Sequence, residues 1–142
     1  MHVWLPSKIH SGLLDQHLLS GKIQLSNSQF TLPAFIIPKA DPMVLPRWVN
    51  DYCKLNETTI NDPYPMPCVD DILADCAKGK IFGVMDITNS FFQMCMHLDS
   101  VPLTAVSTPF RVYEWLVMPM GLKNAPVIHQ RRVCAALRNT LA

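Results

Sequence analysis

Asp86 is the first residue whose type and position could do chemistry, because it directly follows the apolar run of residues 81–85. A carboxylate at the end of a buried strand presents hard oxygen atoms, and Mg²⁺ prefers one or two carboxylates together with phosphate and water oxygens. Aspartates at strand ends also commonly cap the turn that follows, so this segment alone leaves both roles open.

Lys39 and Arg47 flank the tip of a predicted β-hairpin and could bind the phosphates of a nucleotide. The guanidinium offers a planar fork of donors and the ammonium a compact point charge, and both suit phosphate oxygens. An ordinary solvated hairpin carries the same charges, and the spacing alone does not exclude it.

Aromatic and basic residues supply two further candidates. Phe91 and Phe92 follow the candidate carboxylate closely, and one ring could form the floor of a nucleotide pocket. Packing in the core is the alternative for at least one of these rings. Arg131, Arg132 and Arg138 lie on a predicted C-terminal helix and could follow a nucleic-acid backbone. The alternative for these bases is a cationic helix end, which the helix dipole favours.

The composition fits a folded domain or part of a larger one, with 142 residues, 49% of them hydrophobic and 16% charged. Such a chain can build a core and is too apolar for a disordered tail. Five cysteines without a C-x-x-C pair indicate reduced thiols and not a disulfide scaffold or zinc site. No apolar run approaches the roughly 20 residues of a membrane span, and the N-terminus does not resemble a signal peptide. We therefore expect an intracellular protein with no membrane partner, in the cytoplasm or the nucleus.

Charge is unevenly distributed, although the net charge is only +1. Residues 51–100 carry eight acidic and three basic side chains, whereas residues 101–142 carry five basic side chains and one acidic. An acidic middle beside a basic C-terminal segment could serve a chemistry of metal ions and phosphates, and chance clustering on a solvated surface is the alternative. The glycine-rich fingerprints of dinucleotide-binding folds and P-loops do not occur.

The elements that must position these residues begin with a helix and a hairpin. Apolar residues at three-to-five spacing predict a helix over residues 8–20, and Gly21 offers its end. Short strands over residues 34–38 and 46–50, with turn residues between them, predict the hairpin. Prolines then make residues 62–67 an extended connector.

The second half of the chain continues this irregular alternation. A helix is predicted over residues 68–77, followed by a buried strand over residues 81–86 that ends on the candidate carboxylate. Three more strands and a final helix are predicted over residues 93–97, 103–107, 112–117 and 126–141. This pattern predicts an α+β fold and disfavours a doubly wound parallel sheet.

Three long motifs carry a resemblance to a known family. In order they are PRWVNDYCKLNETTINDPYPMPCVDDIL, GKIFGVMDITNSFFQMCM and TPFRVYEWLVMPMGLKNAPVIHQR. From about Leu18 onward, the chain closely resembles the reverse transcriptase of gypsy-type long-terminal-repeat retrotransposons. The resemblance implies an RNA-directed DNA polymerase with a right-hand fold of fingers, palm and thumb. Residues 1–80 would form fingers, and residues 81–142 the start of the palm with a return to the fingers.

The resemblance also implies site residues and ligands. Asp86 would be the first catalytic carboxylate and a ligand of Mg²⁺ or Mn²⁺, together with the Ile87 carbonyl. The nucleotide would meet cations at the fingertips, backbone N–H donors, a bulky residue beneath the sugar and a pocket-lining residue. The cations are Lys39 and Arg47, and the N–H donors belong to Asn89 and Ser90. The bulky residue is Phe91, and the pocket-lining residue is Met120. Gly121 would allow the template backbone to approach closely. The implied partners are an RNA/DNA primer–template and a deoxynucleoside triphosphate, with the remaining polyprotein or a complementing chain left open.

The family places two further carboxylates in an aromatic-x-Asp-Asp motif, which does not occur in this sequence. The thumb, the second half of the palm and RNase H are also missing from it. We therefore expect that this fragment does not polymerise DNA alone, because one carboxylate does not build a two-metal site. The alternatives are a non-catalytic module that binds nucleic acid or a partner, and a decayed transposon relic without function.

Several positions depart from the family pattern, and most departures are of one kind. Gln24 and Leu25 replace Arg-Pro, and Cys53 replaces a basic residue. Cys95 belongs to a Met-Cys pair that replaces a polar-basic pair, and Arg111 replaces a turn glycine. Each of these changes can arise by a single C-to-T transition on one DNA strand or the other, which is the basis of the relic hypothesis. At Arg111 we expect conformational strain, because glycine turns often need a positive φ.

Overall fold

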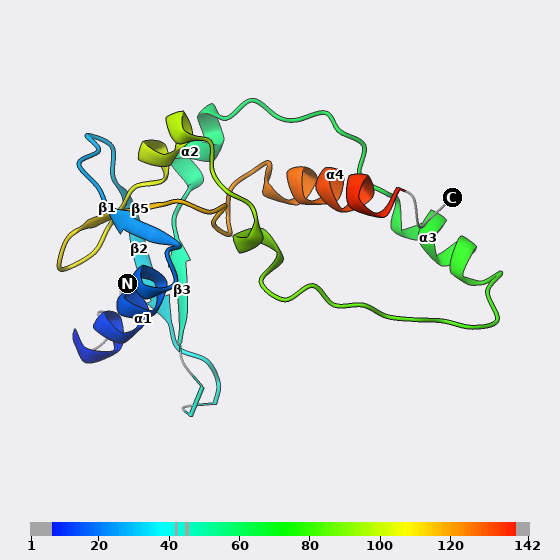
Figure 1. Cartoon of the computed structure of the whole chain (residues 1–142), viewed down its shortest axis with the longest axis horizontal. Coiled ribbons are helices and arrows are strands. Elements are labelled where there is room, and N and C mark those ends of the chain that lie inside the picture. Colours follow the sequence, from blue (N-terminus) through cyan, green and yellow to red (C-terminus); the bar gives the residue numbers. More distant parts are fainter. Residues whose placement is uncertain (1–6, 42, 45, 139–142) are drawn as a thin grey trace.

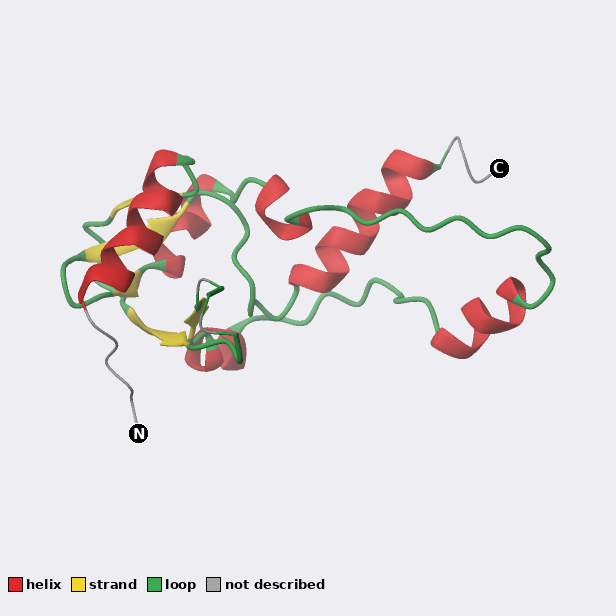
Figure 2. Cartoon of the chain, turned by 90° about the horizontal axis from the view of Figure 1, so that it is seen from below, coloured by secondary structure: helices red, strands yellow, loops and turns green. Residues whose placement is uncertain are grey.

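The centre of the fold is a five-stranded mixed sheet in the order β1-β5-β4-β2-β3. The computed structural model describes residues 7–41, 43–44 and 46–138. Its strands are β1 (Ile23–Leu25), β2 (Leu32–Ile37), β3 (Arg47–Asn50), β4 (Val106–Ser107) and β5 (Val112–Trp115). Figures 1 and 2 show these strands gathered at one end of an elongated molecule, with α1 (Ser7–Leu19) against them. The predicted α+β class is confirmed.

The hairpin of β2 and β3 was predicted, and its register explains its stability. The two strands pair antiparallel, with Phe35 opposite Val49 and Ile36 opposite Trp48. Aromatic and β-branched residues facing one another across a ladder are favourable cross-strand pairs. β2 also pairs in parallel with β4, so the hairpin is joined firmly to the rest of the sheet.

Gly21 ends the first helix and turns the chain into β1. Its φ is +66°, and the N–H of Lys22 bonds back to the carbonyl of His17 at 3.0 Å. A glycine in the left-handed region is the common end of a helix, because it carries no Cβ to clash. β1 then pairs antiparallel with β5, which places Ile23 opposite Trp115. The three residues of β1 are too few for a sequence pattern to predict.

The core lies between α1 and the sheet. Leu14, Ile23, Val106, Tyr113 and Trp115 form one buried cluster there. Burial of such side chains contributes on the order of 2 kcal/mol each. The cluster therefore holds α1 onto the sheet.

Thr104 joins the sheet to the segment before it through its buried hydroxyl. Its Oγ1 accepts from the N–H of Trp115 at 2.9 Å and donates to the carbonyl of Val101 at 2.7 Å. The Tyr52 hydroxyl donates to the Thr104 carbonyl at 3.3 Å. Burial raises the pKa of that Tyr52 hydroxyl well above its ordinary value. These bonds lock the 3₁₀ segment η2 (Leu98–Thr104) under β5.

The last two helices extend away from the sheet. After α2 (Cys53–Thr58), the proline-rich connector has no regular structure, as predicted, and leads to α3 (Val69–Cys76). Figure 1 shows α3 at the far end of the molecule, joined to the sheet region by two long connections. The final helix α4 (Ala125–Leu137) begins one residue earlier than predicted, and residues 139–142 lie outside the described residues.

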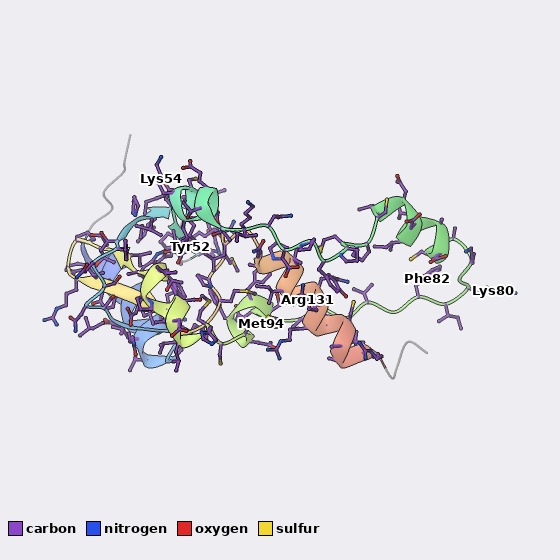
Figure 3. The ribbon with its side chains drawn as sticks, turned by 90° about the horizontal axis from the view of Figure 1, so that it is seen from above. Tyr52, Lys54, Lys80, Phe82, Met94 and Arg131 are labelled. Atoms are coloured by element: carbon purple, nitrogen blue, oxygen red, sulfur yellow. The ribbon has the colours of Figure 1, made fainter. Side chains whose placement is uncertain are left out.

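The predicted buried strand over residues 81–86 is wrong. This segment has no regular structure, and Ile81 and Val84 are 95% and 99% exposed. A strand needs a neighbour for its ladder hydrogen bonds. No strand in the described part of the chain lies beside this segment. Figure 3 shows Phe82 and Lys80 near α3, far from the sheet.

Two other predicted strands form only in small part. Before residues 93–97 the chain forms η1 (Ser90–Gln93), and only Cys95 makes an isolated bridge, to Val117. Of residues 103–107, only Val106–Ser107 is a strand. The predicted strain at Arg111 is also wrong, because Asn89 is the one non-glycine residue with positive φ in the described residues. Thr108 instead closes that turn with the Arg111 carbonyl and N–H.

Across the described ranges, no helix combines the length and apolar character needed to cross a membrane.

Candidate functional site

A cavity of about 820 Å³ opens between the hairpin, α1 and the loop after β5. Its lining brings together six residues that the sequence singled out from separate stretches. These are Lys39, Arg47, Asn89, Phe92, Met120 and Gly121. A volume of this size is typical of small-molecule and cofactor sites.

The hairpin supplies the positive charge of the cavity. Arg47 lies opposite Ile37 in the β2–β3 ladder, and Lys39 follows the end of β2. Both side chains are exposed, and neither forms an ion pair with a carboxylate among the described residues. Arg47 Nη2 lies 3.9 Å from the sulfur of Met120, across the cavity. The two cations are therefore available to an anionic ligand.

Aromatic rings form the wall behind these cations. Phe92 stacks on Trp115 with ring centroids 5.5 Å apart, and Trp48 meets Trp115 edge-on at 6.0 Å. The Lys22 ammonium lies 5.0 Å from the centroid of the Phe92 ring. Such contacts fix ring orientation beyond the effect of burial alone. The cavity therefore has a rigid apolar wall and a cationic rim.

His17 is a cavity residue that the sequence reasoning missed. Its ring lies 5.3 Å from that of Trp115 and 5.6 Å from that of Trp48. Burial, with a smaller contribution from the nearby Lys22 charge, lowers the pKa of this imidazole below 6.5. His17 is thus neutral at pH 7 and behaves as part of the aromatic wall. Its spacing of four residues from Leu13 on α1 was the signal that could have found it.

Gly121 occupies a position that requires glycine. Its φ is +100°, which L side chains rarely adopt. A Cβ built there would lie 3.4 Å from Cδ2 of Tyr52 and 3.7 Å from the carbonyl oxygen of Asn50. The loop therefore approaches the end of β3 closely, and its backbone forms part of the cavity wall.

The other candidate residues of the motif GKIFGVMDITNSFFQMCM lie outside the cavity. Asp86 is exposed on the irregular segment after α3. Ile87 and Ser90 line a separate groove of about 630 Å³ between η1 and α4. The Phe91 ring contacts His129 of α4, with centroids 5.4 Å apart. Of the phenylalanine pair, the described structure thus places Phe92 in the cavity and Phe91 against α4.

Asn89 connects the cavity to this second groove. It is in the left-handed conformation, with φ of 52°, and its carbonyl accepts from the N–H of Phe92 at 2.9 Å. This turn starts η1 and sends the two phenylalanine rings in different directions. The conformation is uncommon for residues other than glycine, with asparagine among the more tolerant.

The arginines of α4 have different surroundings. Arg131 Nη2 lies 2.6 and 2.7 Å from the two carboxylate oxygens of Asp62, and its guanidinium stacks 4.9 Å from the Tyr64 ring centroid. The hydrogen bond from Arg131 is the main cause that lowers the pKa of the Asp62 carboxyl. Figure 3 shows Arg131 on α4. Arg132 lines the groove and Arg138 is exposed, so these two bases keep their charge free of a carboxylate in the described structure.

The described residues do not fit a two-metal centre. None of them form a group of three or more histidine, cysteine, aspartate or glutamate side chains that could hold a metal ion. Asp86 supplies a single exposed carboxylate, and a metal ion of this class usually needs further oxygen ligands. We therefore derive no catalytic step through a metal ion from these residues.

Comparison with known proteins gives the family. Residues 37–142 match the family described as reverse transcriptase (RNA-dependent DNA polymerase). The chain is 40% identical over 128 residues to the retrovirus-related Pol polyprotein from transposon opus of Drosophila melanogaster, covering 88% of this chain and 13% of that polyprotein. It is 37% identical over 118 residues to the enzymatic polyprotein of cauliflower mosaic virus (strain CM-1841), covering 82% of this chain and 17% of the polyprotein. The chain thus spans less than a fifth of these relatives.

Solved structures agree on the fold. The protease–reverse transcriptase of prototype foamy virus matches with a TM-score of 0.79 at 24% identity, over 98% of this chain and 19% of that one. The foamy viral enzyme in complex with an RNA/DNA hybrid matches with a TM-score of 0.78 at 21% identity, again over 98% of this chain and 19% of that one. These matches do not favour a separate binding module or a relic. The chain belongs to the reverse transcriptase (RNA-dependent DNA polymerase) family and spans only part of the length of these relatives.

Proposed function

We propose that this chain is the fingers and the first part of the palm of a gypsy-type retrotransposon reverse transcriptase. Residues 1–80 form the fingers, and residues 81–142 form the start of the palm and the return to the fingers. Its cavity binds the triphosphate of an incoming deoxynucleotide, beside an RNA/DNA primer–template. The similarity to the Drosophila transposon polyprotein and to a foamy viral enzyme in complex with an RNA/DNA hybrid supports these assignments.

The observation that carries the proposal is the convergence of distant residues on one cavity. The hairpin contributes Lys39 and Arg47, the start of η1 contributes Asn89, and the loop after β5 contributes Met120 and Gly121. Each was a candidate from the sequence, and they come from segments that only the fold brings together. A cavity whose rim carries two cations, free of carboxylates in the described part of the chain, with aromatic rings behind them, suits a ligand with a phosphate chain and an apolar heterocycle.

The second motif completes the proposal. Asp86 would be the first catalytic carboxylate and, with the Ile87 carbonyl, would hold Mg²⁺ or Mn²⁺ only together with oxygen ligands from the rest of a reverse transcriptase. Asn89 donates its backbone N–H to the triphosphate, and Gly121 faces the template. Ser90 and Phe91, which lie toward α4 in this structure, would have to turn to the cavity to donate an N–H and to lie beneath the sugar. The metal ions would supply activation of the primer hydroxyl and neutralisation of phosphate charge. Since the described residues do not form such a site alone, catalysis depends on the rest of a reverse transcriptase.

Equilibrium binding of dTTP tests the role of the cavity. Lys39→Ala and Arg47→Ala each remove one charge-assisted contact, so we expect each to weaken binding by about tenfold or more. Lys54→Ala is the matched control, because Lys54 lies on α2, is exposed and pairs only with its helix neighbour Glu57. We expect the control to bind like the unmodified chain in isothermal titration calorimetry. Equal affinity of all four proteins would refute the cavity as the nucleotide site.

A further inference from the structure

A series of hydrogen bonds joins residues 56–62 to the 118–124 loop. Asn56 is at its centre, because its Nδ2 donates to the Gly121 carbonyl at 2.8 Å and its Oδ1 accepts from the Lys123 N–H at 2.8 Å. One side-chain amide thus pairs with a carbonyl and an N–H of the same loop. This resembles the pairing that a neighbouring backbone strand would provide.

The rest of the series fixes the far end of the same loop. The Lys123 ammonium donates to the Thr59 carbonyl at 3.0 Å, and Asn124 Nδ2 donates to the Ile60 carbonyl at 2.8 Å. Asn124 Oδ1 accepts from the Asp62 N–H at 3.2 Å. Residues 56–62 therefore hold the second half of the loop, from Gly121 to Asn124.

The position of this loop determines the shape of the cavity. Met120 and Gly121 line the cavity together with the hairpin cations, and the Met120 sulfur lies 3.9 Å from Arg47 Nη2. Asn56 itself lines a different pocket, of about 310 Å³, behind the loop. Any effect of Asn56 on the cavity must therefore pass through the loop.

We propose that Asn56 is a positioning residue that holds Met120 and Gly121 at the correct distance from Lys39 and Arg47. The proposal rests on the assignment of the cavity as a nucleotide site. Asparagine suits this position because only an amide offers a donor and an acceptor on one short planar group. Aspartate would keep an acceptor for Lys123 but would face the Gly121 carbonyl with an oxygen. Alanine would remove both bonds.

Asn56→Asp and Asn56→Ala, with Thr58→Ala as control, form the test set. Thr58 lies on the same helix, is exposed, and bonds only to the Leu55 carbonyl of its own helix. The binding of two probes is compared in each protein, namely dTTP and inorganic tripolyphosphate. Tripolyphosphate can engage the hairpin cations but has no sugar or base to meet the loop. Hydrogen–deuterium exchange of the peptide that spans residues 118–125 reports the loop directly.

A positioning role predicts a selective loss. Both Asn56 variants should weaken dTTP binding by about fivefold, which corresponds to one lost hydrogen bond, with tripolyphosphate binding changed less than about twofold. Their loop amides should exchange faster than in Thr58→Ala, which should match the unmodified chain. Equal losses for both probes, or unchanged exchange of the loop, would overturn the proposal. If the unmodified chain binds neither probe, the nucleotide assignment fails, and loop exchange alone decides the role of Asn56.

Discussion

Gln24→Arg should stabilise the fold, because Glu114 is a buried carboxylate that pairs with no cation among the described residues. Glu114 is only 8% exposed, and Gln24 Nε2 donates to its Oε1 at 2.7 Å. Ser26 donates to the other carboxylate oxygen at 2.6 Å. The two strands hold this geometry, since Gln24 lies opposite Glu114 in the β1–β5 register. An arginine at residue 24 would replace a neutral donor by a charged one without moving the backbone.

The magnitude follows from the difference between the two kinds of hydrogen bond. A bond from a neutral donor to a carboxylate already contributes about 1.5 kcal/mol or more, and a charged donor adds the attraction of an ion pair, about 0.2–1 kcal/mol at an exposed site. Because residue 24 is exposed and solvent screens part of the gain, we expect the free energy of unfolding to rise by about 1 kcal/mol. For a chain of this length that corresponds to roughly 3 °C in Tm.

Urea unfolding followed by circular dichroism measures this change. Gln29→Arg is the matched control, because it adds the same charge at an exposed glutamine that does not face Glu114. Gln24→Met should lower the free energy of unfolding, since it leaves one carboxylate oxygen without its side-chain donor. A gain that is equal in Gln24→Arg and Gln29→Arg, or absent from both, would refute the reasoning.

Three further predictions concern the loop, α4 and catalysis. Gly121→Ala should lower the free energy of unfolding by about 1 kcal/mol or more in urea titrations, because alanine is strained at a φ of +100°; an unchanged midpoint would contradict this. Arg131 holds the pKa of Asp62 below 3.8, so its stabilising contribution is fully present above about pH 4 and is lost as the pH falls through the lowered value. Asp62→Asn should therefore lower Tm at pH 7 and change it little near pH 2, and a loss that does not depend on pH would exclude this ion pair as the cause. Residues 1–142 alone should give no primer extension with Mg²⁺ or Mn²⁺, and synthesis that Asp86→Asn abolishes would show that one carboxylate suffices.

The departures from the family pattern have different structural consequences. Gln24 keeps a hydrogen bond to Glu114, and Leu25 is 54% exposed at the outer strand. Arg111 fits its turn without a positive φ. Cys53 is exposed, and its thiol pKa is raised, first by a hydrogen bond from the thiol to Asp51 and then by the charge of that carboxylate. These substitutions are accommodated by the fold, and the relic hypothesis depends on the codons and not on structural damage.

The sequence predicted the elements whose patterns are local. Apolar periodicity and Gly21 gave the first helix, and the two short strands with turn residues between them gave the hairpin. The prolines gave an extended connector, and the first-turn aspartates gave α3. Each of these rests on a few neighbouring residues, and neighbouring residues are what a sequence pattern can report. The roles of the candidate site residues stay predictions.

Tertiary structure determined the features that depend on contacts between distant segments of the chain. Residues 81–86 have the composition of a buried strand but are extended and exposed, since no described strand pairs with them. Arg131 has the charge of a nucleic-acid contact but binds Asp62 instead. The two adjacent phenylalanines are separated by the left-handed turn at Asn89, one facing the cavity and the other α4. Residue types and order identify the family, whereas the cavity and the loop held by Asn56 exist only once distant segments meet in the fold.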